Sequence, residues 1–281
     1  MAVDYIVNLA CEPKRTAGDG DIFDGAARLL DMMKAMTRAE VMTERARQAG
    51  HDPATFTFSI IVRTATGQEQ REVSLADLWA EAAPLAGYGA YCTGCPANFR
   101  GNAIAGCIGA LNYPIPLAAE EWLVAQIQPV GTIGGNFLVK AIKDFSYDGA
   151  PTAQMRTRRD LYEAPTAPEK MVEKKLFRST KVSSNQILQA IFSVGNSLDP
   201  AHCFLVLIWL GAIKMDGRVP GGTDELPRFQ EMIGLAPDQR LARTSLAFGP
   251  GRHPPEAARF VGLFDAMYRA WLLDVPLLIS A

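Results

Sequence analysis

The sequence predicts an α+β protein, on three observations. Runs of Val, Ile, Thr, Phe and Tyr in the first quarter of the chain are typical of strands. Apolar residues at helical spacing fill the stretch between the first two runs and most of the second half. A short turn joins two of the runs, and strands joined in this way pair antiparallel. We therefore expect an N-terminal β-α-β-β unit, a cysteine-rich irregular loop and then a mostly α-helical C-terminal half.

A strand and one long helix are predicted first. Residues 3–10 alternate and are rich in Val, Ile and Tyr, which indicates a strand that ends before Cys11. After a loop that contains Pro and Gly, Asp21 or Asp24 is expected to cap a helix that reaches about residue 49. The apolar side chains of this helix fall mainly on one broad face, as in a helix that packs on a core.

A hairpin and a short helix come next. Residues 55–64 are β-branched and aromatic, and residues 69–74 return as a second strand after a Gly-containing turn. Ser74 precedes a helical stretch at 75–83 and is the expected N-cap, with Asp77 at the third position of the helix.

The second half is predicted to be helical. Asp199-Pro200 is typical of a helix start, because Asp caps the N-terminus and Pro suits the first helical position. Pro and Gly residues separate most of the other helical stretches. The predicted helices lie at 118–128, 136–145, 169–177, 185–194, 200–213, 226–233 and 255–273.

Two domains are expected, joined by a linker. Residues 147–168 contain several Pro and Gly residues and the basic run Arg156, Arg158 and Arg159, a composition typical of a linker or exposed loop. The predicted divisions are an α+β domain at 1–146 with its cysteine loop at 87–116, the linker at 147–168, and a helical domain at 169–281.

The composition indicates a soluble protein of the cytoplasm. The 281 residues are 48% hydrophobic and 21% charged, with a formal net charge of −2, which gives no reason to expect nucleic acid or an anionic membrane as a partner. The longest apolar run, 203–213, is shorter than the roughly 20 residues that a membrane helix needs. No basic region precedes the first apolar stretch, so no signal peptide is predicted. Cytoplasmic thiols stay reduced, which favours metal or redox roles for clustered cysteines.

Three of the five cysteines form the most informative motif. Two residues separate Cys92 from Cys95, and Cys107 follows in the same Gly-rich stretch. Two thiols at this spacing can bind one metal ion, and a third can close on it. A tetrahedral zinc site takes four ligands, and the expected fourth is Cys11 at the end of the first strand. The alternative fourth ligands are His51, His202 and Cys203.

Three functions remain open on this sequence. The first is a protein with structural zinc that acts through interaction or assembly, with a protein partner or a second copy of the chain. The second is a redox protein or enzyme that uses an iron–sulfur cluster or a Cys92–Cys95 thiol pair in the same loop. The third is a metal-free binding module that uses the basic stretch 156–181. The cysteines would then be separate thiols with no joint role.

No other motif is complete. The acidic residues around Asp21 lack the further ligands of an EF-hand loop, since Leu30 stands where the closing Glu is required. The glycines at 131–135 lack the Lys-Ser/Thr pair of a phosphate-binding loop and predict a turn. His202 and Cys203 are neighbours on a predicted helix and point about 100° apart, so they do not form a dyad.

Overall fold

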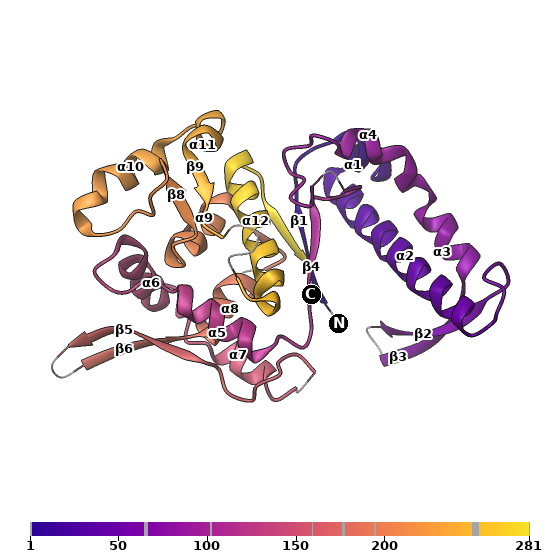
Figure 1. Cartoon of the computed structure of the whole chain (residues 1–281), viewed down its shortest axis with the longest axis horizontal. Coiled ribbons are helices and arrows are strands. Elements are labelled where there is room, and N and C mark those ends of the chain that lie inside the picture. Colours follow the sequence, from indigo (N-terminus) through magenta and orange to yellow (C-terminus); the bar gives the residue numbers. More distant parts are fainter. Residues whose placement is uncertain are drawn as a thin grey trace. The chain divides into compact units, whose positions relative to one another are not determined.

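The computed structural model divides the chain into two compact units, which Figure 1 draws in sequence colours. Unit 1 comprises Met1–Leu9 and Cys107–Ala281, and unit 2 comprises Ala10–Gly106. Helices and strands are mixed in the chain, which confirms the α+β class. The structure describes residues 2–64, 67–101, 103–158, 160–175, 178–193, 195–248 and 253–280.

A four-stranded antiparallel sheet of order β4-β1-β10-β7 lies in unit 1. The inner strands are β1 (Ala2–Val7) and β10 (Leu277–Ser280), which come from opposite ends of the sequence. β4 (Ile108–Asn112) and β7 (Ser197–Leu198) are the outer strands. β1 has a partner on both sides, and five of its six residues are buried.

A close approach inside this sheet requires a glycine. Tyr5 of β1 lies opposite Gly109 of β4. A Cβ atom on Gly109 would lie 2.4 Å from the Tyr5 ring, a distance that real Cβ contacts do not reach. The tyrosine ring therefore occupies the space that a side chain at position 109 would need.

The core of unit 1 is built around two apolar helices. α12 (Ala258–Leu273) packs on β1, β4 and α9 (Pro200–Trp209). The rings of Phe260 and Phe264 are fully buried on α12. Burial of each such side chain contributes about 1.5–3 kcal/mol relative to exposure.

The start of α9 agrees with the predicted cap. Asp199 Oδ1 accepts the backbone N–H of His202 at 2.8 Å, and Pro200 holds the first helical position. This bond satisfies one of the N–H groups that a helix leaves without an internal partner.

The remaining elements of unit 1 surround this core. The helices are α5 (Leu117–Gln126), α6 (Ile133–Asp144), α7 (Ala150–Met155), α8 (Ser184–Phe192), α10 (Leu226–Gly234) and α11 (Pro237–Arg243). Two antiparallel strand pairs join β5 (Glu169–Lys175) to β6 (Arg178–Ser183) and β8 (Ile213–Met215) to β9 (Thr244–Leu246). The short 3₁₀ segments are η2 (Thr223–Glu225) and η3 (Pro255–Ala257).

Unit 2 is organised by its long helix. α2 (Ile22–Gln48) packs against α1 (Glu12–Ala17) and α3 (Leu75–Ala82). Asp21 Oδ1 accepts the N–H groups of the first turn of α2, as predicted for a cap. α1 and α2 approach so closely that a Cβ on Gly25 would lie 1.7 Å from the carbonyl oxygen of Lys14.

The rest of unit 2 is a hairpin followed by short helical segments. β2 (Thr57–Thr64) pairs with β3 (Gly67–Ser74), and Ser74 Oγ then accepts the N–H of Asp77 at 3.0 Å as the predicted cap of α3. The 3₁₀ segment η1 (Ala83–Tyr88) leads into α4 (Gly89–Cys92).

The predicted β-α-β-β unit does not appear as one sheet in the described part of the chain. β1 pairs with β4 and β10, whereas β2 and β3 pair only with each other. Alternation along 3–10 indicates a strand but not its partner, and the partner β10 lies at the other end of the sequence.

The helix predicted at 169–177 is wrong. Residues 169–175 form β5, which pairs with β6, and the N–H of Val130 donates to the carbonyl of Val172 at 2.8 Å. Lys, Glu and Met favour helices, but strand pairing outweighs this local preference. Phe177, at the end of the predicted helix, lies outside the described residues, as does Val194 at the end of the helix predicted at 185–194.

The boundaries between the two units do not fall in the linker predicted at 147–168. Residues 147–168 belong to unit 1 and contain α7 together with the buried Arg156. The actual division falls at residues 9–10 and 106–107. Pro, Gly and Arg in this segment therefore belong to a packed connection and not to a link between domains.

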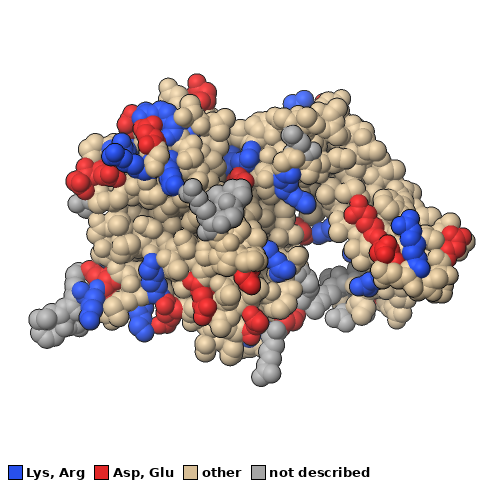
Figure 2. All heavy atoms as spheres, in the orientation of Figure 1, with Lys and Arg blue, Asp and Glu red and all other residues tan. Residues whose placement is uncertain are grey.

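The surface carries mixed charge. Acidic and basic side chains are interspersed on the face drawn in Figure 2, in keeping with the net charge of −2. Within the described ranges, each helix is too short or too polar to cross a bilayer.

Candidate functional site

The structure places the four predicted metal ligands in two groups. Cys92 ends α4 and Cys95 follows three residues later, while Cys11 directly precedes α1, so all three belong to unit 2. Cys107 belongs to unit 1, where its carbonyl accepts the N–H of Val7 at 3.0 Å beside the sheet. All of the cysteines are thiols, and these four are half-buried.

A tight turn brings Cys92 and Cys95 together. The N–H of Cys95 donates to the carbonyl of Cys92 at 3.3 Å, and Gly94 lies in the left-handed region with φ 72°. A turn of this type keeps its end Cα atoms within about 7 Å. Disulfides span Cα separations of about 4.4–6.8 Å, so the turn suits a reversible bond between these two thiols.

The side chain of Asn98 holds the loop around this turn. Its amide nitrogen donates to the carbonyls of Cys92 at 3.0 Å and Ala103 at 2.9 Å, and its oxygen accepts the N–H of Arg100 at 3.0 Å. Asn98 is buried, and a Cβ on Gly106 would lie 2.0 Å from its oxygen. One buried amide therefore holds the segment between α4 and β4, whose described residues form no helix or strand. The cysteine loop predicted at 87–116 is thus only partly irregular, since α4 and β4 lie within it.

A strained residue directs a donor at the Cys92 sulfur. The N–H of Ala105 donates to Cys92 Sγ at 3.2 Å, and Ala105 has φ 50°, which is uncommon for a residue with a Cβ. Such strain costs about 1–3 kcal/mol and concentrates at functional sites. Backbone donors to sulfur also tune thiolate-bound metal clusters. This contact distinguishes Cys92 from a cysteine that only fills space.

The described residues do not assemble a closed four-ligand metal site. Among them, no three or more His, Cys, Asp and Glu side chains form a group that fits a metal ion. Of the predicted ligands, the structure joins Cys92 and Cys95 on one turn, and Cys107 belongs to the other unit.

The alternative fourth ligands have structural roles. His202 Nε2 lies 2.8 Å from the carbonyl oxygen of Ala190, so this nitrogen carries the proton and donates. Cys203 is fully buried in α9, and burial raises the pKa of its thiol well above the usual range. The ring of His51 packs on Phe56, with centroids 5.6 Å apart.

Arg156, which the sequence placed in an exposed basic run, is buried in an ion pair with Glu120 of α5. Its Nη1 donates to Glu120 Oε1 at 3.0 Å and to the Ala164 carbonyl at 3.1 Å. Its Nη2 donates to Glu120 Oε2 and to Ser184 Oγ, and its Nε donates to Asn185 Oδ1. All five guanidinium hydrogens are therefore bonded inside the fold.

Two further contacts complete this buried cluster. Ser184 Oγ donates to Glu120 Oε2 at 2.6 Å, and the guanidinium of Arg156 lies 4.2 Å from the ring centroid of Tyr162. Burial raises the pKa of the Tyr162 phenol, which therefore stays protonated. The cluster joins α5, α8 and the segment after α7, so its role is structural.

A second basic residue of the stretch 156–181 also makes hydrogen bonds within the fold. Lys170 Nζ donates to the carbonyls of Ala125 at 2.7 Å and Ile127 at 2.6 Å, at the C-terminus of α5. A cation at this end of a helix satisfies its unbonded carbonyls. Arg159 lies outside the described residues. Arg156 and Lys170 make contacts inside the fold, so these two cations are not available to the binding surface predicted on this stretch.

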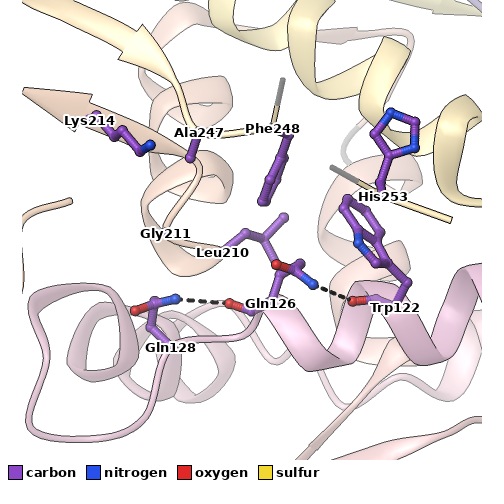
Figure 3. A pocket seen from close by; sticks show the side chains of 9 residues that line it. All are labelled: Trp122, Gln126, Gln128, Leu210, Gly211, Lys214, Ala247, Phe248 and His253. Carbon is purple, nitrogen blue, oxygen red and sulfur yellow. Dashed lines mark hydrogen bonds between the residues drawn. The ribbon is translucent and has the colours of Figure 1, made fainter. Parts of the chain in front are cut away.

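One pocket in unit 1 has no counterpart in the sequence prediction. It has a volume of about 340 Å³ and lies between the end of α5, the segment after α9, and β8 and β9 (Figure 3). Its side chains come from separate parts of the sequence, and no motif links them. The lining residues are Trp122, Gln126, Gln128, Leu210, Gly211, Lys214, Ala247, Phe248 and His253.

Comparison with protein-family models, curated proteins and solved structures finds no match to this chain.

Proposed function

We propose that unit 2 is a dithiol module in which Cys92 and Cys95 exchange between two thiols and a disulfide. The supporting observation is the Ala105 N–H bond to Cys92 Sγ, next to a turn whose Cα separation of less than about 7 Å is compatible with a disulfide between Cys92 and Cys95. Because this bond holds the sulfur of Cys92 in place, Cys92 is the proposed attacking cysteine.

The proposed exchange uses a disulfide R–S–S–R as the oxidant. The Cys92 thiolate attacks one sulfur of this disulfide, forms a mixed disulfide and releases the first thiolate. The Cys95 thiolate then attacks the Cys92 sulfur, closes the Cys92–Cys95 bond and releases the second. Two electrons pass to the substrate, and the two protons of the cysteines end on two R–SH molecules.

Equilibration in glutathione redox buffers is expected to interconvert the pair at a midpoint between about −270 and −120 mV, the range of thiol–disulfide proteins. Alkylation followed by peptide mass spectrometry measures the fraction of each cysteine that is in the reduced, thiol form. Cys203 is expected to stay unmodified in the folded protein, because it is buried and its thiol pKa is raised.

A Cys95→Ser variant is expected to stop at a mixed disulfide on Cys92, whereas Cys11→Ser, the matched control, keeps the wild-type midpoint. Thiols at 92 and 95 that stay fully reduced across the whole series would contradict the proposal.

A metal site is the second proposal, and the same N–H···S contact favours it, because such donors accompany thiolate-bound metals. Cys92 and Cys95 would supply two thiolates to zinc or an iron–sulfur cluster, with Cys107 and Cys11 as the further ligands predicted from sequence. Interaction or assembly in the cytoplasm would be the resulting activity.

Anaerobic purification with elemental analysis and a visible spectrum tests this second proposal. Zinc near one equivalent, lost in Cys92→Ser, is expected for a zinc site, and a brown colour for a cluster. If the protein is free of metal and forms the Cys92–Cys95 disulfide, the metal site is contradicted and the dithiol exchange is supported.

A further inference from the structure

We infer that the pocket of unit 1 binds a small planar aromatic carboxylate that also carries a hydrogen-bond donor. Its volume of about 340 Å³ lies at the lower end of ligand sites, which span about 300–1,000 Å³. A compact molecule of one or two fused rings suits this size.

One side of the pocket is aromatic. The ring of Phe248 lies edge-on to Trp122 with centroids 5.1 Å apart, and that of His253 does so at 6.4 Å (Figure 3). Trp122 also stacks on the buried Phe264, which fixes its ring in place. Rigid aromatic walls favour a planar ligand, because ring pairs gain energy from stacked and edge-to-face contacts.

The opposite side of the pocket supplies a positive charge. Lys214 extends from β8, and within the described ranges its ammonium has neither an ion-pair nor a hydrogen-bond partner. None of the nine lining residues is acidic. Lys214 is a half-buried residue, and an ammonium without a counter-ion favours an anionic group on the ligand, so that this one cation matches a single carboxylate.

Two amides add hydrogen-bond acceptors. Gln128 Nε2 donates to the carbonyl of Gln126, and Gln126 Nε2 donates to the carbonyl of Trp122, each at 3.0 Å (Figure 3). These bonds orient the amides, and in the described part of the chain their Oε1 atoms accept no hydrogen bond. A hydroxyl or ring N–H on the ligand would satisfy them.

A glycine makes room for this arrangement. Gly211 has φ 62°, and a Cβ at this position would lie 2.5 Å from Gln128 Nε2. Any other residue would displace the Gln128 amide from its place in the wall.

Calorimetric titration with 6-hydroxy-2-naphthoate tests the inference on the wild-type protein. We expect binding with a Kd of about 1 mM or below, and about tenfold weaker binding of both the matching carboxamide and the saturated decahydro acid. The carboxamide lacks the negative charge of the acid, and the decahydro acid lacks its planar aromatic rings. No binding of the aromatic acid at about 10 mM, or equal affinity for all three molecules, would overturn the inference.

Lys214→Met is expected to weaken binding of the acid about tenfold and to abolish the difference between acid and carboxamide. Lys143→Met, at an exposed lysine of α6, is the matched control and is expected to bind like wild type. Unchanged discrimination in Lys214→Met would overturn the role of this ammonium. The comparison of the three ligands on wild type stands even if the variant folds poorly.

Discussion

Replacing Arg156 by Met is expected to lower the free energy of unfolding of unit 1 by about 3–5 kcal/mol, the cost of removing one partner of a buried ion pair. The Glu120 side chain is 0% exposed and that of Arg156 is 3% exposed. Without Arg156, the buried Glu120 carboxylate keeps Ser184 as its remaining donor in the cluster. Urea unfolding followed by tryptophan fluorescence measures the change.

Two further variants separate the buried charge from the loss of packing. The double variant E120Q/R156M removes both charges and is expected to lose less stability than R156M, because no unpaired carboxylate stays buried. Lys140→Met breaks the exposed pair with Asp144 and is expected to change stability by about 1 kcal/mol or less. If R156M and Lys140→Met lower the free energy of unfolding equally, the buried cluster contributes no more to stability than an exposed ion pair.

Gly25→Ala is expected to destabilise unit 2 by about 2–3 kcal/mol, although alanine normally stabilises a helix relative to glycine by about 1 kcal/mol. The added methyl group would lie 1.7 Å from the Lys14 carbonyl oxygen and 2.5 Å from its carbon. Both are backbone atoms, so α1 and α2 must move apart to admit it.

Hydrogen exchange measured by mass spectrometry on peptides from α1 and α2 tests this prediction. Faster exchange in these two helices is expected in Gly25→Ala. Gly234→Ala is the control, since nothing lies within 4 Å of a Cβ at the end of α10. Equal exchange in Gly25→Ala and wild type would refute the close packing of the two helices.

Local signals in the sequence identified three helix caps, but they missed α1 (Glu12–Ala17), which lies in the loop predicted after Cys11, and they did not predict the long-range strand pairing. The caps at Asp21, Ser74 and Asp199 are all confirmed, because a cap depends on residues within one turn. The helix at 169–177 was wrong, because strand pairing decided the outcome there.

The candidate sites likewise combine features that the sequence shows with features that only the structure shows. The spacing of Cys92 and Cys95 is visible in the sequence, and the structure joins them on one turn. The donor from Ala105 is not visible, since nothing about an alanine indicates a left-handed backbone. The pocket around Trp122 and Lys214 combines distant segments and is seen only once the chain is folded.

The pairing of β1 with both β4 and β10 makes unit 2 an insertion within a β-hairpin of unit 1. On the ribosome, β1 emerges early but must wait for β10, while residues 10–106 are already complete and free to fold. Val7 and Cys107, on either side of the insertion, are joined by a backbone hydrogen bond of 3.0 Å. A short turn between these strands is therefore expected to replace all of unit 2 and leave the sheet intact.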